Sequence, residues 1–312
     1  MTNPKTIRLG TRGSPLALLQ AQMVEDRLKA AHSGLHVERV VIKTSGDWRP
    51  EQGETRLSEI EGGKGLFIRE IEKALVDGAI DLAVHSMKDV PSFLPEGLAV
   101  DHVLERADAR DAFICNDYAS YMDLPEGAIV GTSSLRRQSF LLSRRSDLTV
   151  VPLRGNVATR LAKMNEGRVQ ATFLAMAGLT RLGITGDYIH PLSVGDMVPA
   201  CAQGIIGIET REDDSSTRAL LDAIHHHETG LCGYAERAAL QVLDGSCHTP
   251  IGAHAVLENG DMTMMLVVGS GDGTRMFDTH GKAPVATKAE ATDFGAALAK
   301  SLKPRIPADI FS

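Results

Sequence analysis

Short strand-like runs alternate with helix-like runs along most of the chain, and this alternation limits its fold more than any other feature. An apolar run at residues 6–10 has strand character, and Ser14 and Pro15 then suit the N-cap and first turn of a helix. The order of strand, polar loop and helix recurs at residues 127–145, 148–167 and 169–183. The pattern predicts parallel sheets built from βαβ units.

The last ninety residues follow a different pattern. Helix-like segments at about 215–226 and 229–243 precede strand-like runs that are separated by Asn259-Gly260 and Asp272-Gly273, dipeptides typical of hairpin turns. A final helix-like segment covers about 288–302. A chain of 312 residues is long for one domain. We therefore predict two α/β domains followed by a small α+β domain with an antiparallel sheet.

The composition indicates a soluble globular protein. Apolar residues make up 43% of the chain and charged residues 23%, and no apolar run is long enough for a membrane span. The N-terminal residues lack the apolar stretch of a signal peptide, so we expect a cytoplasmic protein without a membrane partner. The formal net charge of −7 argues against nucleic-acid binding.

Positive charge is concentrated in one part of this acidic chain. Between residues 132 and 181, eight arginines and one lysine outnumber one aspartate and one glutamate. Several of these cations lie in loops after predicted strands, where ligand sites of open α/β sheets are found. Two interpretations remain open from the count: a solvated basic face, or a site for an anionic ligand.

The strand-end loops favour an anionic ligand. The loops "GTRGSP", "GTSSLRR" and "LRGNVATR" place hydroxyls and guanidinium groups at helix starts, where backbone N–H groups attract anions. No phosphate-binding P-loop motif is present, so a ligand with several carboxylates fits better than a phosphate. The candidate binding residues are Arg12, Ser14, Thr132, Ser133, Ser134, Arg136, Arg137, Arg154, Arg160 and Arg181.

The loop "HSMKDVP" places Lys88 beside Asp89 at the end of a buried strand. Asp89 could transfer a proton or stabilise a cation, and a structural salt bridge or helix cap explains it equally well. Asp47 and Asp111 are weaker candidates of the same kind. Three consecutive histidines at 225–227 point in different directions on a helix, so we predict no metal site.

The four cysteines are Cys115, Cys201, Cys232 and Cys247. None forms a Cys-x-x-Cys pair, so we expect most of them to be reduced core residues. Cys247 differs because it lies in the loop "LDGSCHTPIG", between a helix-like and a strand-like segment. Its position leaves packing, metal binding, a disulfide, nucleophilic catalysis and covalent anchoring all open.

Taken in order, these loops resemble the porphobilinogen deaminase family. The similar segments are "TRGSPLAL", "KTSGD", "GGKGLFIREIE", "DLAVHSMKDVP", "RDAF", "GTSSLRRQ", "LRGNVATRL", "LAMAGLTRLG", "HHET", "AERAAL" and "GSCHTPIGAHA". They extend from residue 11 to about residue 255. The resemblance implies an enzyme of porphyrin, tetrapyrrole and heme biosynthesis that joins four porphobilinogen molecules into hydroxymethylbilane with loss of ammonia.

The resemblance also implies a role for individual residues. A dipyrromethane cofactor, one per chain, would be joined to Cys247 by a thioether, and Asp89 would be the catalytic residue. The implied cofactor-binding residues are Lys88, Thr132, Ser133, Ser134, Arg136, Arg137, Arg160 and Gly178. The implied substrate-binding residues are Arg12, Ser14, Arg154 and Arg181.

The family's fold is similar to that of periplasmic binding proteins, and the family suggests a monomer. We accordingly expect a first domain at 1–104 with 205–222, a second at 110–198, and a C-terminal domain at 227–312 that carries Cys247. The alternative is a non-catalytic, two-domain anion-binding or ligand-sensing protein, which would need neither Cys247 nor Asp89.

Overall fold

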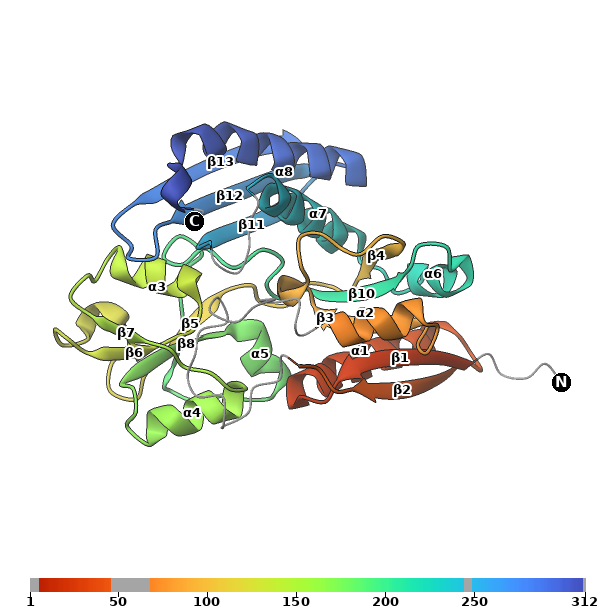
Figure 1. Cartoon of the computed structure of the whole chain (residues 1–312), viewed down its shortest axis with the longest axis horizontal. Coiled ribbons are helices and arrows are strands. Elements are labelled where there is room, and N and C mark those ends of the chain that lie inside the picture. Colours follow the sequence, from red (N-terminus) through yellow and green to blue (C-terminus); the bar gives the residue numbers. More distant parts are fainter. Residues whose placement is uncertain (1–5, 46–67, 244–248, 311–312) are drawn as a thin grey trace. The chain divides into compact units, whose positions relative to one another are not determined.

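A computed structural model describes residues 6–45, 68–243 and 249–310, and the chain divides into two units (Figure 1). The first unit contains residues 1–47, 64–107 and 204–230, and the second contains residues 48–63, 108–203 and 231–312. The chain therefore leaves the first unit after residue 107 and returns to it at residue 204. The expected fold class, two α/β sheets followed by a small antiparallel sheet with helices, is confirmed.

The first unit is a mixed five-stranded sheet with the order β2-β1-β3-β10-β4. Its elements are β1 (Thr6–Arg12), α1 (Pro15–Ala31), β2 (His36–Ile42), α2 (Arg69–Val76), β3 (Leu82–Ser86), η4 (Met87–Asp89), β4 (Leu98–Val103), β10 (Ile206–Arg211) and α6 (Ser215–Asp222). Strand β1 is parallel to β2 and β3, as predicted, but β10 is antiparallel to β3 and β4. The predicted parallel arrangement therefore holds for β1, β2 and β3 but not for β10, which joins this sheet after the chain returns from the second unit.

Alternating side chains of β3 pack on both faces of this sheet. Leu82 and Val84 pack in a cluster with α1 residues such as Val24 and Leu28. Ala83, which points to the opposite face, packs with Ile71 of α2. Both faces are therefore covered by helices, which explains why β3 is apolar along most of its length.

The second unit contains a five-stranded sheet with the order β7-β6-β8-β5-β9. Its elements are β5 (Asp111–Ile114), η5 (Tyr121–Asp123), β6 (Ile129–Gly131), α3 (Leu135–Leu142), β7 (Thr149–Val151), α4 (Val157–Asn165), β8 (Ala171–Ala175), α5 (Met176–Arg181) and β9 (Ile189–Pro191). Strand β6 is parallel to β7 and β8, whereas β5 is antiparallel to β8 and β9. As in the first unit, one strand departs from the predicted parallel sheet.

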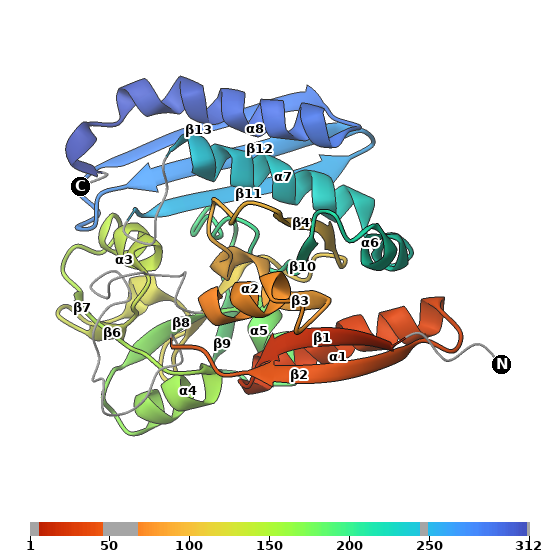
Figure 2. The ribbon, with the colours of Figure 1, turned by 45° about the vertical axis from the view of Figure 1, so that its right-hand side comes forward.

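The same unit contains a three-stranded antiparallel sheet with the order β11-β12-β13. Its elements are α7 (His227–Val242), which begins in the first unit, β11 (Ile251–Glu258), β12 (Asp261–Gly269), β13 (Met276–Pro284), α8 (Lys288–Leu302), η6 (Lys303–Arg305) and η7 (Ala308–Ile310) (Figure 2). Asn259 and Gly260 both have positive φ, at 53° and 84°, so the predicted hairpin turn is confirmed. A Cβ atom on Gly295 of α8 would collide with the backbone of Ala235 in α7, so these helices pack closely.

Three cysteines fit the expectation of small core residues. Cys115, Cys201 and Cys232 are buried thiols that form no disulfide among the described residues, and the last two belong to the core of the three-stranded sheet. Among the described residues, no helix is both long and apolar enough to cross a membrane.

A buried carboxylate on α7 joins two segments of the second unit. Glu236 is fully buried, and its Oε2 accepts a hydrogen bond of 2.6 Å from the backbone N–H of Ala202. Its Oε1 accepts a bond of 2.7 Å from the N–H of Ala255 in β11. Ala202 has a φ of 59°, which is unfavourable for a residue with a Cβ atom. Glu236 thereby fixes a strained turn just before the chain returns to the first unit.

Replacement of Glu236 by alanine should lower the free energy of unfolding by about 2–4 kcal/mol, because two buried N–H groups lose their charged acceptor. Chemical denaturation followed by circular dichroism measures this loss. Glu236→Gln retains one carbonyl acceptor and should lose clearly less. Equal stability of the alanine variant and the unmodified protein would contradict this role.

Candidate active site

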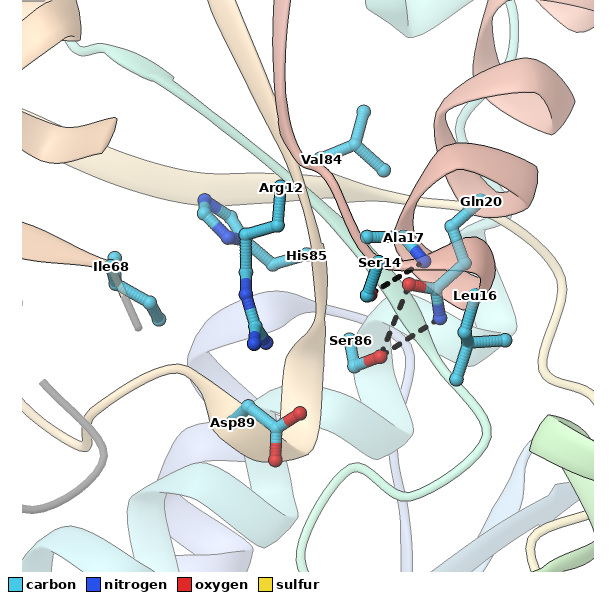
Figure 3. Close-up of a pocket in the computed structure, with 10 residues that line it drawn as sticks. All are labelled: Arg12, Ser14, Leu16, Ala17, Gln20, Ile68, Val84, His85, Ser86 and Asp89. Atoms are coloured by element: carbon cyan, nitrogen blue, oxygen red, sulfur yellow. Dashed lines mark hydrogen bonds between the residues drawn. The ribbon is translucent and has the colours of Figure 1, made fainter. Parts of the chain in front are cut away.

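Functional side chains of the first unit gather where β1 and β3 end. Arg12 is the last residue of β1, and Ser14 caps α1 by accepting a 3.3 Å hydrogen bond from the N–H of Ala17. Lys88 and Asp89 lie in η4, directly after β3. The strands are parallel, so both chain segments emerge at the same edge of the sheet. The structure therefore brings Arg12, Ser14 and Asp89 to one pocket (Figure 3).

Sequence reasoning missed three polar residues of this pocket. Its full lining is Arg12, Ser14, Leu16, Ala17, Gln20, Ile68, Val84, His85, Ser86 and Asp89. Gln20 and Ser86 bond to each other, with the Gln20 Nε2 group 2.8 Å from the Ser86 hydroxyl. Gln20 has helical spacing typical of a buried face, and no local pattern marked it as a pocket residue. Together these groups make a polar pocket with one cation and one carboxylate.

His85 forms a buried pair with Glu209 of β10. The His85 Nε2 lies 2.9 Å from Oε2 of Glu209, and both side chains are buried. Burial raises the pKa of the neighbouring Glu72, and the charge of Glu209 adds to that rise. The pair was invisible in the sequence because 124 residues separate its members.

The second unit has a corresponding edge. Strands β6, β7 and β8 are parallel, and the polar loops that were singled out in the sequence follow β6 and β7. Ser134 caps α3 by accepting a 3.4 Å hydrogen bond from the N–H of Arg137. Thr132 accepts a bond of 3.2 Å from the N–H of Ser134, and Ser133 accepts one of 3.1 Å from the N–H of Leu153. These hydroxyls hold the two loops in place.

Further cations lie at this edge. The Nε of Arg160 donates to the carbonyl of Gly155 at 2.9 Å, and Nζ of Lys163 donates to the carbonyl of Arg154 at 2.9 Å. Arg154 is itself buried. Arg181 ends α5, and burial lowers its pKa to about 10. A bound carboxylate would stabilise such a desolvated guanidinium, so this edge suits an acidic ligand.

Gly178 is buried in the middle of α5, one turn before Arg181. Its carbonyl accepts a hydrogen bond of 3.2 Å from the N–H of Leu182. Because glycine has no side chain, the backbone of α5 is uncovered by a side chain of its own at this one position.

Arg136 and Arg137 have partners that the sequence did not reveal. Arg136 donates to one oxygen of Asp111 at 2.6 Å and to the carbonyl of Val198 at 2.7 Å. Arg137 donates twice to the other oxygen of Asp111, at 2.6 and 3.1 Å, and also to the carbonyl of Phe173 at 2.7 Å. Burial lowers the pKa of Arg136, and the nearby Asp111 carboxylate opposes that change.

These bonds change how the two arginines are understood. We expected both guanidinium groups to face a ligand, but in this structure Asp111 of the same chain binds both. Gln203 adds a bond of 3.1 Å to the same carboxylate. Asp111, a weak catalytic candidate in the sequence, is thus a fully buried counter-ion at the start of β5.

Some predicted site residues cannot be placed. Cys247 and Asp47 lie outside the described residues. The histidines at 225 and 226 accept backbone hydrogen bonds through Nδ1, from Val103 and Thr229 respectively. Within the described part of the chain, no group of three or more metal-binding side chains is assembled.

Asp111→Asn should lower the free energy of unfolding by about 3–5 kcal/mol, because it leaves two buried guanidinium groups without a counter-ion. Thermal denaturation of this variant measures the loss. Asp147→Asn is the matched control, since Asp147 pairs with Arg145 at a solvated position and its loss should change the stability far less. Similar losses for both variants would contradict the structural role of Asp111.

The chain is similar to several solved structures, all distantly. One is a periplasmic substrate-binding protein of an ABC transporter from Coxiella burnetii, with 14% identity over 74% of this chain and 96% of that chain, and a TM-score of 0.44. Another is the methionine-binding protein MetQ, with 15% identity over 78% of this chain and 96% of that chain, and a TM-score of 0.43. We draw no functional conclusion from likenesses at this level.

Two protein-family models match the chain much more informatively. Residues 7–219 match "Porphobilinogen deaminase, dipyromethane cofactor binding domain", and residues 231–304 match "Porphobilinogen deaminase, C-terminal domain". These matches cover most of the chain and confirm the resemblance seen in the sequence. The chain therefore belongs to the porphobilinogen deaminase family: it is a transferase of tetrapyrrole biosynthesis, a hydroxymethylbilane synthase, that acts on porphobilinogen and binds a dipyrromethane cofactor.

Proposed function

We propose that the enzyme joins four porphobilinogen molecules head to tail, releases one ammonia per condensation, and frees the product as linear hydroxymethylbilane. The observation that carries this proposal is the gathering of cationic side chains at the sheet edges of an acidic protein, within a porphobilinogen deaminase chain. Porphobilinogen bears an acetate and a propionate group. Each added unit therefore brings two more carboxylates that need cationic partners.

The residues of the second unit fit an acidic pyrrole cofactor. The start of α3 presents backbone N–H groups beside Thr132 and Ser134, and Arg181 has a guanidinium whose pKa is lowered by burial. When bound, dipyrromethane supplies a covalent primer for the growing chain. We assign cofactor binding to Lys88, Thr132, Ser133, Ser134, Arg136, Arg137, Arg160 and Gly178, and substrate binding to Arg12, Ser14, Arg154 and Arg181.

We assign the attachment point to Cys247. A thioether between its sulfur and a pyrrole methylene is stable enough to persist through four condensations. The two arginines paired with Asp111 would then act on the cofactor only through N–H groups that Asp111 and the backbone carbonyls leave available.

Asp89 is the proposed catalytic group. Departure of ammonia from porphobilinogen leaves a positive charge that is shared with the pyrrole nitrogen. A carboxylate close to that nitrogen stabilises the charge and orients the N–H group. Asp89 shares its pocket with Arg12, so a substrate carboxylate could bind the cation while its pyrrole faces the anion.

The remaining proposals concern organisation and location. We propose three domains, at 1–104 with 205–222, 110–198, and 227–312. We also propose that the enzyme is a cytoplasmic monomer without a nucleic-acid or membrane partner. Sedimentation and fractionation experiments test the last two statements directly.

The intact mass of the purified protein tests the covalent primer. It should exceed the sequence mass by two pyrrole units, and Cys247→Ser should remove this addition. Cys115→Ala, which changes a buried cysteine elsewhere, should retain it. An active enzyme with an unmodified, alkylatable Cys247 would contradict the proposal.

Asp89→Ala should leave folding and cofactor attachment intact but reduce kcat by about 10²–10³-fold, by analogy with the loss of one charge-stabilising group. Turnover of porphobilinogen, measured at equal cofactor content, gives the effect. Asp77→Ala is the control, because Asp77 is exposed at the C-terminal end of α2 and pairs with Lys73 of that helix. Near-normal turnover of Asp89→Ala would exclude Asp89 as the principal catalytic residue.

A further inference from the structure

Each condensation releases a proton that needs an acceptor. The C–N bond of the protonated aminomethyl group (–CH2–NH3⁺) breaks with its electron pair on nitrogen, which leaves as neutral ammonia. The methylene carbon then bonds to the free α-carbon of the preceding pyrrole, and that carbon must lose its hydrogen as a proton. Asp89 is needed as an anion to stabilise the positive charge of the next unit. A second group that takes the ring proton would leave Asp89 ionised.

His85 is placed to be that group. We propose that His85, oriented by Glu209, is the general base that accepts the proton from the pyrrole α-carbon. This proposal rests on the proposed function and adds a residue to it. His85 lines the same pocket as Asp89, and only three residues separate the two in the sequence (Figure 3).

The hydrogen bond to Glu209 fixes which ring nitrogen can act. A carboxylate only accepts hydrogen bonds, so Nε2 of His85 carries the hydrogen that Glu209 binds at 2.9 Å. The Nδ1 atom then has a lone pair. Within the described part of the chain, the hydrogen bond that the structure gives the His85 ring is the one between Nε2 and Glu209. The side chain is 3% exposed, so the imidazole is held tightly while it still lines the pocket.

Charged groups surround the His85 ring, and the nearest one would stabilise its protonated form. Glu209 on β10 is fully buried, and it would stabilise the imidazolium that forms when Nδ1 takes the proton. Helix α2 adds Glu72 and Arg69, β1 adds Arg12, and η4 adds Asp89. A fully buried carboxylate is unfavourable unless it is paired, and the hydrogen bond with His85 provides that pairing for Glu209.

His102 and Asp222 provide a matched pair elsewhere in the first unit. The Nε2 of His102 lies 2.9 Å from Oδ1 of Asp222, the same geometry as His85 and Glu209. His102 is buried in β4 but is not part of the Asp89 pocket. The His102 side chain is buried, whereas the Asp222 side chain is 74% exposed. Substitution of His102 therefore removes a buried histidine and its carboxylate hydrogen bond without touching the proposed base.

The experiment compares holoenzymes of His85→Gln, Glu209→Gln and His102→Gln, each with its cofactor content measured by intact mass. Porphobilinogen with deuterium at its free α-carbon reports directly on the proton step. His85→Gln should lose about 10²-fold or more in kcat and show a primary isotope effect, because proton removal becomes rate-limiting. Glu209→Gln should show a smaller change of the same kind, and His102→Gln should show neither.

Two results would overturn the proposal: near-normal kcat in His85→Gln, or a loss of kcat without an isotope effect. The first leaves the role of Asp89 and the primer intact, since those are tested by Asp89→Ala and by intact mass. Imidazole added to His85→Ala should restore part of the activity. If these variants fail to fold, ¹⁵N NMR of the wild-type holoenzyme decides, since a hydrogen on Nδ1 instead of Nε2 of His85 in the resting enzyme would also contradict the proposal.

Discussion

Parallel strands must release the segments that follow them at one edge of the sheet, and both α/β units depend on this constraint. In the first unit, β1 and β3 deliver Arg12 and Asp89 to the same pocket. In the second, β6 and β7 deliver the two loops that are rich in hydroxyl and guanidinium groups. Residues scattered over some 170 positions are thereby gathered into two groups. The antiparallel strand β10 lies between β3 and β4, and the antiparallel strand β5 lies between β8 and β9.

Three fully buried carboxylates support these edges from within the protein. Asp111 holds Arg136 and Arg137, Glu209 holds His85, and Glu236 holds the turn at Ala202. Each has its negative charge balanced by a cation, a histidine or backbone N–H groups, as burial requires. These three carboxylates therefore bind groups of the protein itself. In the proposed mechanism, Arg12, Arg154 and Arg181 bind the carboxylates of the substrate.

Local sequence patterns predicted the elements well. Ser14 and Pro15 start α1 as expected, α8 has the predicted bounds, and the Asn259-Gly260 hairpin forms. These features depend on neighbours within a few residues. The carboxyl-edge loops were also identifiable, because strand–loop–helix order fixes where they emerge.

Contacts between distant residues were not predictable in this way. Nothing near Arg136 or Arg137 shows that Asp111, about 25 positions earlier, will bind both guanidinium groups. Glu209, the partner of His85, lies 124 residues later in the sequence. It is on β10, which follows the segment at 108–203 that belongs to the second unit. Such pairs depend on which strands become neighbours. In the first unit, β10 lies between β3 and β4, and no local pattern in the sequence predicts this strand order.

The most direct test of the central claim asks whether charge at the sheet edge binds the acidic pyrrole chain. Arg154 lies at that edge, whereas Arg168 is exposed and pairs with Glu166 in the turn after α4. Bound cofactor and turnover are measured for Arg154→Gln and Arg168→Gln. Our account predicts at least about a tenfold loss in cofactor content or turnover for Arg154→Gln, and no loss for Arg168→Gln. Equal behaviour of the two variants would contradict it.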